Sequence, residues 1–152
     1  MRGIGPFVRS WREARRFGKR PRPAGDIVFY SEGTPYGGFL GPVVESLVED
    51  LGRTVCYVTS DAGDPVLDGR DQRIRTFCVG HESARIFLFE TLQAAVMVMT
   101  MPDLNTFHIK RSHYPVHYAH LLHSMVSTHM IYRAGAFDHF DSVLCTGPHQ
   151  KT

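Results

Sequence analysis

Histidines cluster in the last third of the chain, where eight of the nine lie between His108 and His149. The imidazole ring changes charge near neutral pH, so it can act as an acid, a base or a partner for an anion. His123 ends a run of apolar residues, and a base in such a position can take a proton from a substrate hydroxyl. His123 is therefore the candidate catalytic residue, and the alternative is a hydrogen-bonded structural histidine.

The spacing of the histidines argues against a metal site. Four, three, three and six residues separate His113, His117, His120, His123 and His129. In an extended strand these spacings place His117, His120 and His123 on different faces, where they cannot converge on one ion. No cysteine or carboxylate completes a ligand set. We therefore expect neither a metal nor a cofactor.

Four glycines follow the first predicted strand, in the segment 33–41. Gly33, Thr34, Gly37 and Gly38 are the candidate substrate contacts, because a flexible loop before a helix lets backbone N–H groups approach a phosphate. The segment matches neither the Gly-x-Gly-x-x-Gly pattern nor the P-loop, so dinucleotide or ATP binding is unsupported. Two interpretations of this segment stay open: it contacts an anion or an acceptor, or it is a plain flexible turn.

Charged residues follow the fourth predicted strand. Asp103 comes shortly after it, and Lys110 and Arg111 follow within eight further residues. A carboxylate at this place can orient a hydroxyl, and the two cations can bind a phosphate. The alternative is that all three are solvated loop charges.

Strand-like and helix-like segments alternate from residue 26 onward. The predicted strands span residues 27–31, 54–59, 74–79, 95–100, 116–122 and 142–145, and the predicted helices span about 42–51 and 81–92, with partial helix after 128. This alternation, with a fourth strand that is apolar on both faces, indicates an α/β fold: a Rossmann-like parallel sheet with flanking helices. Ligands bind such sheets at the carboxyl ends of the strands, where Asp103 and His123 fall.

The composition indicates one globular domain. The chain has 152 residues, of which 43% are hydrophobic, and no apolar run approaches the ~18 residues of a membrane span. Cys56, Cys78 and Cys145 form no Cys-x-x-Cys pair and are predicted to be reduced core residues of a cytoplasmic protein.

The basic charge is concentrated at the N-terminus. Residues 1–25 hold eight of the 17 basic residues and one of the 15 acidic residues, which leaves nine and fourteen for the domain at 26–152. Residues 5–18 are predicted to form a helix with Phe7, Trp11 and Ala14 on one face. This basic segment either lies on an anionic membrane surface or packs its aromatic residues on the body. Nucleic acid is not an expected partner, since the sequence shows no further basic patch.

Seven segments together resemble the N-terminal half of the CDP-glycerol glycerophosphotransferase family, which builds teichoic-acid-type polymers. The matching segments are residues 27–33, 58–61, 96–104, 106–112, 122–132, 135–141 and 143–149. The resemblance implies a GT-B transferase with two Rossmann-like halves, the first for the acceptor and the second for the cytidine nucleotide donor. This chain would be the acceptor half of a divergent member, and its end at Thr152 favours a longer protein that continues with the donor half.

The same resemblance assigns roles to single residues. His123 falls on the histidine of the Trp-His-Gly motif of the family, with Leu122 in place of the tryptophan and Ser124 in place of the glycine. His129 lies where a lysine is expected, and Ser124 and His129 are therefore candidate substrate contacts. The resemblance also implies CDP-glycerol or a related CDP-polyol as donor, a lipid-linked glycopolymer as acceptor, and a place on the inner face of the plasma membrane. A nucleotide-sugar transferase and a non-catalytic membrane-tethered module are the rival interpretations.

Overall fold

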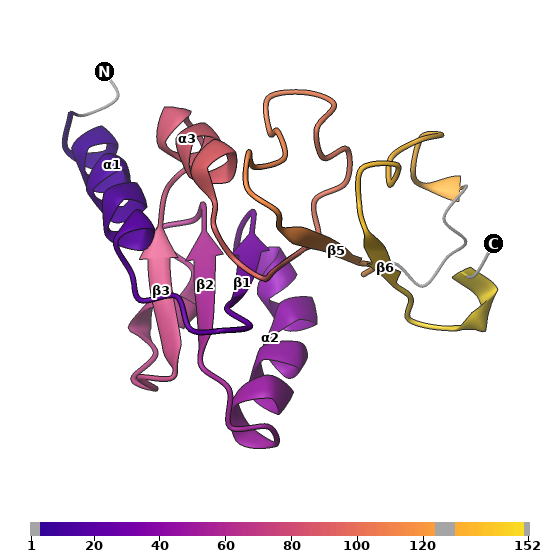
Figure 1. Ribbon diagram of the computed structural model, residues 1–152, viewed down its shortest axis with the longest axis horizontal. Helices are drawn as coiled ribbons and strands as arrows, with labels where there is room; N and C mark the ends of the chain where they lie inside the picture. Colours follow the sequence, from indigo (N-terminus) through magenta and orange to yellow (C-terminus); the bar gives the residue numbers. More distant parts are fainter. Residues whose placement is uncertain (1–3, 124–129, 151–152) are drawn as a thin grey trace.

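The computed structural model describes residues 4–123 and 130–150 (Figure 1). The helices of this part are α1 (Ile4–Gly18), α2 (Thr34–Glu49) and α3 (Ser83–Thr91). The strands are β1 (Ile27–Ser31), β2 (Val55–Thr59), β3 (Ile74–Cys78), β4 (Val96–Met99), β5 (His117–Leu121) and β6 (Ser142–Leu144). Short 3-10 turns follow β2 and β6, at η1 (Pro65–Asp68) and η3 (Pro148–Gln150).

All six strands are parallel and form one sheet in the order β3-β2-β1-β4-β5-β6. This is the strand order of the doubly wound dinucleotide-binding fold. The predicted Rossmann-like α/β sheet is therefore confirmed, and each strand agrees with its predicted range to within one residue at either end. The order of the chain reverses between β1 and β4, and ligands of such sheets bind in the crevice outside this switch point.

Helices cover both faces of the sheet. α1 and α3 pack on one face and α2 on the other. Phe29 and Tyr30 are adjacent in β1 and fully buried in opposite cores, because successive side chains of a strand point to opposite sides. β4 lies between β1 and β5, and its Met97 and Val98 are likewise buried on the two faces, as its apolar sequence predicts.

The start of α2 corrects the prediction of a flexible loop over residues 33–41. The helix begins at Thr34, eight residues before the predicted start near Pro42. Gly37 and Gly38 therefore lie in its first turns and have helical neighbours on both sides. The predicted helix exists, but it is longer than the apolar pattern alone indicates.

Burial of an apolar stripe explains the early start of α2. Pro35 suits the first turn, because its ring presets φ and its missing N–H has no partner within the helix there. Leu40, Val44 and Val48 recur every fourth residue and are buried against the sheet. Tertiary packing of this stripe outweighs the poor helix propensity of the glycines.

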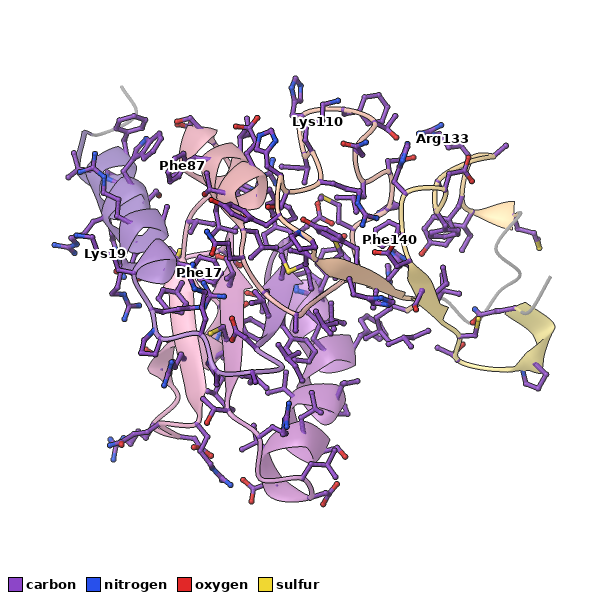
Figure 2. All side chains as sticks on the ribbon, in the orientation of Figure 1. Phe17, Lys19, Phe87, Lys110, Arg133 and Phe140 are labelled. Atoms are coloured by element: carbon purple, nitrogen blue, oxygen red, sulfur yellow. The ribbon has the colours of Figure 1, made fainter. Side chains whose placement is uncertain are left out.

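α1 packs Trp11 and Phe17, two of its three aromatic residues, on the body of the protein (Figure 2 labels Phe17). The ring centroid of Trp11 lies 5.3 Å from that of Phe87 in α3. Phe17 is buried and meets Phe77 of β3 edge to face, with 5.2 Å between the ring centroids. Of the two interpretations of residues 1–25, packing on the body is the one that the structure shows.

α3 and the last strand differ from expectation in detail. α3 is shorter than the predicted helix over residues 81–92, and its buried residues are Ala84, Leu88 and Phe89. Cys145, predicted to be a core residue, is exposed just after the edge strand β6, whereas Cys56 and Cys78 are buried.

A buried ion pair joins the end of α1 to the start of β1. Arg20 Nη2 lies 2.5 Å from Asp26 Oδ2, and their side chains are only 3% and 6% exposed. The same guanidinium donates to the backbone carbonyls of Phe17, at 3.1 Å, and of Gln93, at 2.9 Å. The backbone carbonyl of Asp26 in turn accepts the N–H groups of Ala95 and Val96 at the start of β4. One pair therefore holds α1, β1 and β4 together at the amino-terminal edge of the sheet.

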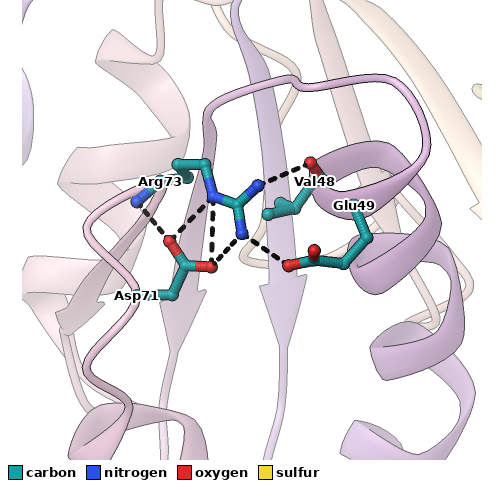
Figure 3. Close-up of polar contacts among 4 residues, drawn as sticks. All are labelled: Val48, Glu49, Asp71 and Arg73. Atoms are coloured by element: carbon teal, nitrogen blue, oxygen red, sulfur yellow. Dashed lines mark hydrogen bonds and ion pairs between the residues drawn. The ribbon is translucent and has the colours of Figure 1, made fainter.

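A second cluster of ionic contacts ties β3 to α2 (Figure 3). Arg73 precedes β3 and donates to both carboxylate oxygens of Asp71, to Glu49 and to the carbonyl of Val48. Glu49 and Val48 form the last turn of α2, so the link fixes the helix end against the edge strand. The side chains of Arg73 and Glu49 are 43% and 64% exposed, and such pairs contribute little to stability.

The two clusters predict different responses to mutation. Asp26→Ala should lower the free energy of unfolding by about 3–5 kcal/mol, because it leaves a buried guanidinium without its carboxylate. Glu49→Ala, at the exposed pair, should change it by less than about 1 kcal/mol. Urea unfolding followed by circular dichroism measures both values, and equal losses would contradict the role given to the buried pair.

Candidate functional site

Five strand ends meet at the carboxyl-terminal edge of the sheet. Glu32 follows β1, Asp61 follows β2, His81 follows β3, Thr100 follows β4 and His123 follows β5. Because all strands are parallel, these residues lie along one edge. The candidate base thus lies on the side of the sheet where ligands of this fold class bind.

His123 packs against the first turns of α2. Its ring is perpendicular to that of Tyr36, with 5.5 Å between the centroids, and tilted on Phe39 at 5.3 Å. Its Nδ1 is buried and has no hydrogen-bond partner among the residues that the structure describes. The structure thus brings His123 to the glycine-containing segment, although the two are far apart in the sequence.

Glu32 is a site residue that the sequence did not single out. Burial raises the pKa of its carboxyl group above the usual value, and the positive charges of Arg85, His81 and His123 oppose that rise. Glu32 is therefore close enough to His123 for their charges to interact. A carboxyl group with a raised pKa that interacts electrostatically with an imidazole is a combination suited to proton transfer.

A chain of hydrogen bonds stiffens the same edge. Arg85 Nη1 donates to Tyr30 Oη at 3.1 Å, Tyr30 pairs with Ser60 Oγ at 2.8 Å, and Ser60 donates to the carbonyl of Gly80 at 2.7 Å. The chain links α3 to the ends of β1, β2 and β3. Arg85 Nε is buried without a hydrogen-bond partner among the described residues. Arg85 is thus a cation held in place at the candidate site.

Thr34 makes its polar contacts to a carboxylate of the protein. Its backbone N–H and its hydroxyl donate to Asp61 Oδ2, at 3.2 and 2.7 Å. The hydroxyl bond, the Gly63 N–H and the Thr34 N–H lower the pKa of Asp61. The carboxylate of Asp61 thereby binds the start of α2, the place at which contact with an anion or acceptor is one of the two predictions.

The helical glycines line a pocket beside this helix start. Gly37 and Gly38 border a cavity of about 280 Å³ together with Thr34, Tyr57 and Asp64. The glycines thus leave space next to the helix, while Gly33 before it has extended backbone. Contact with an anion or acceptor remains a prediction for these residues.

His120 lies in β5, one residue before the end of the strand, and is surrounded by aromatic rings. Its ring is fully buried, with centroids 4.7 Å from Phe137 and 5.0 Å from Phe140. Burial lowers its pKa from 6.5 to about 4, the charge of His123 adds to this, and the Met101 backbone opposes it as the smallest effect. Neither ring nitrogen has a partner of normal hydrogen-bond geometry among the described residues. His120 is thus neutral at pH 7.

The three charged residues after β4 do not gather at one place. Asp103 has a left-handed backbone with φ of 61°, and its Oδ1 lies 2.6 Å from Arg133 Nε. Lys110 is exposed and donates to the carbonyl of Asn105 at 3.2 Å. Arg111 lies elsewhere, at the amino-terminal ends of β5 and β6.

Arg111 is engaged in structural contacts. It donates to the carbonyls of His139 and Val116, at 2.6 and 3.2 Å, and to Asp141 Oδ2 at 2.9 Å. Val116 directly precedes β5 and Asp141 directly precedes β6, so this guanidinium lies at the edge opposite to His123. The geometry therefore does not favour a joint site in which Asp103 orients a hydroxyl while Lys110 and Arg111 bind a phosphate.

Two predicted contacts, Ser124 and His129, lie outside the described residues. Within residues 4–123 and 130–150, no three His, Cys, Asp or Glu side chains are grouped so that they could hold a metal ion. No helix in this part of the chain has the length and apolar character needed to cross a bilayer. No family model matches the chain, and neither curated proteins nor solved structures show a significant match to it.

The buried state of His120 predicts a pH dependence of stability. Between pH 6.5 and about 4 the unfolded chain binds a proton on this ring and the folded chain does not, so the free energy of unfolding falls as the pH is lowered. The loss due to His120 should reach roughly 3 kcal/mol near pH 4, since one pKa unit corresponds to about 1.4 kcal/mol. Urea unfolding at pH 7, 6, 5 and 4 measures it.

His120→Gln should remove this part of the pH dependence, because glutamine does not titrate. His108→Gln is the matched control, since His108 is exposed. A decline of equal steepness in the wild type and His120→Gln would show that His120 is not the group responsible.

Proposed function

We propose that this chain is the acceptor-binding half of a transferase that moves a polyol phosphate from a CDP-polyol, such as CDP-glycerol, to a cell-surface glycopolymer. The observation that carries the proposal is the position of His123. It lies after β5 at the carboxyl edge, packed on the start of α2 and close to Glu32 at the end of β1. Support from the sequence comes from the resemblance of the segments around His123 to the glycerophosphotransferase family.

The reaction proposed is an in-line displacement at phosphorus. The acceptor hydroxyl oxygen attacks the β-phosphate of the donor, a new P–O bond forms, and the bond to cytidine monophosphate breaks. His123 takes the proton of the hydroxyl, and cytidine monophosphate leaves with the bridging oxygen and its electron pair. A general base of this kind typically contributes 10²–10⁴-fold to the rate.

Two neighbours of His123 have roles in this scheme. Glu32 in its ionised form would stabilise the imidazolium ion that forms when His123 takes the proton. Arg85, held by the hydroxyl of Tyr30, is the cation placed to attract a phosphate at this edge. Arg85 takes over the role first given to Lys110 and Arg111, because Arg111 faces the opposite edge.

The rest of the proposal concerns partners and place. The nucleotide would bind a second Rossmann-like half, and the two halves would enclose the carboxyl edge of this sheet. The acceptor would be lipid-linked, which places the enzyme on the inner face of the plasma membrane. Neither a metal nor a cofactor takes part in the scheme.

The test incubates the product of the complete gene with radiolabelled CDP-glycerol and a lipid-linked acceptor. Transfer of label to the acceptor is expected. His123→Gln should lower kcat at least about a hundredfold while leaving the fold intact, because the hydroxyl then lacks its base. His108→Gln, an exposed histidine outside the site, should retain full activity.

Assays of the same enzyme with a panel of nucleotide donors can refute the proposal. Absence of transfer from every CDP-polyol would overturn it, and consumption of a nucleotide sugar instead would reassign the chain to glycosyl transfer. Full activity of His123→Gln would refute the role of His123 alone.

A further inference from the structure

α1 lies beside β3, the edge strand at the opposite end of the sheet from β6 (Figure 1). Residues of α1 and β3 line a groove here. Its volume is about 1090 Å³, and its apolar lining comes from Phe7, Trp11, Ile74 and Phe77. Phe7 is 50% exposed, so apolar surface remains open at the end of the groove where α1 begins. The groove uses none of the residues placed at the carboxyl edge.

Cations line both sides of this groove. Arg12 and Arg15 are exposed on α1 and Lys19 just after it, and Arg70 and Arg75 come from the chain before and within β3. Tertiary structure thus adds cations of the body to those of the N-terminal segment. The sequence alone, read as one basic segment and an acidic body, did not show this patch.

The acidic side chain at the groove is already neutralised. Asp71 lines the groove, but both its oxygens accept hydrogen bonds from Arg73 (Figure 3). Two lining cations are also engaged, Arg16 with Glu13 at 2.7 Å and Arg20 with Asp26. The other five keep a net positive charge beside an apolar floor.

We propose that this groove binds an anionic amphiphile, namely a phosphorylated lipid with a single acyl chain. The acyl chain would cover the apolar floor, where burial of hydrocarbon is favourable. The phosphate would lie at the cationic sides, with which it forms charge-assisted hydrogen bonds. The inference goes beyond the proposed transferase and does not depend on it.

Two observations favour a lipid over the other anionic partners. An acidic peptide would bind most readily by adding a strand to β3, but Arg16 Nη2 already donates to the Thr76 carbonyl at 2.5 Å and covers that edge. A helix that lies flat on a membrane needs its apolar face free, but the apolar face of α1 carries the buried Ala14 and Phe17. The groove beside the helix is what remains open to hydrocarbon.

Trp11 reports on the groove directly, because it is the only tryptophan in the chain. The experiment titrates the 152-residue chain with monomeric lysophosphatidylglycerol, below its micelle concentration, and follows tryptophan emission and the heat of binding. We expect a saturable change with one lipid per chain. Lysophosphatidylcholine of the same acyl length should bind at least about tenfold more weakly, since its headgroup has no net negative charge.

Matched pairs of variants distinguish binding in the groove from a general effect of the protein's positive charge. Arg15→Gln with Arg75→Gln removes one cation from each side and should weaken binding at least about tenfold. Arg22→Gln with Lys110→Gln removes the same charge outside the groove and should leave binding unchanged. Phe7→Ser should also weaken binding, whereas Phe107→Ser, at an exposed phenylalanine elsewhere, should not. Thermal unfolding of each variant confirms that it is folded.

Several results would overturn the inference. One is the absence of a saturable signal, and another is equal affinity of the groove variant and the wild type. Glycerol phosphate that binds as tightly as the lysolipid would mean a plain phosphate site. Binding only to phosphatidylglycerol vesicles would mean a membrane-surface contact, and tighter binding of an acidic peptide would mean a peptide groove.

Discussion

The buried pair between Arg20 and Asp26 is the contact on which the arrangement of the molecule depends. Taking two charges out of water is costly, and their attraction offsets this only when further hydrogen bonds satisfy them. Arg20 finds these at the carbonyls of Phe17 and Gln93, and the second carboxylate oxygen of Asp26 accepts from the thiol of Cys56 at 3.9 Å. The pair thereby fixes α1 against the sheet. The groove beside β3 exists because this pair holds α1 next to that strand.

The two edges of the sheet use their polar groups differently. At the amino-terminal edge the charges are paired: Arg20 with Asp26, Arg73 with Asp71, and Arg111 with Asp141. Buried side-chain atoms without hydrogen-bond partners among the described residues include Nε of Arg20 at the amino-terminal edge and atoms of Arg85, Thr100, His120 and His123 toward the carboxyl-terminal edge. Unpaired buried groups reduce stability, so the four toward the carboxyl-terminal edge call for an explanation other than folding. One such explanation is a substrate that supplies the missing hydrogen-bond partners, and the site proposed at His123 agrees with this explanation.

His120 in β5 and His123 just after it show how the position of a histidine determines what its ring can do. His120 is enclosed by Phe137, Phe140 and Tyr132, and burial keeps it neutral. His123 comes three residues later, beyond the strand, and is only partly buried against Tyr36. One ring thus fills the core and the other can meet a substrate. Three residues of extended chain, about 10 Å, make this difference.

The sequence by itself determined the class of the fold and the place of the strands, because β-strands such as Val96–Met99 carry their signal locally, as short apolar runs between turn residues. It also placed His123 at a strand end. Tertiary structure alone decided that α2 begins at Thr34, that Arg111 faces the amino-terminal edge, and that the charges of Arg85 and His123 both act on Glu32. These facts depend on which surfaces meet across the sheet, since burial and ion pairing join residues far apart in the chain and leave no local pattern to read.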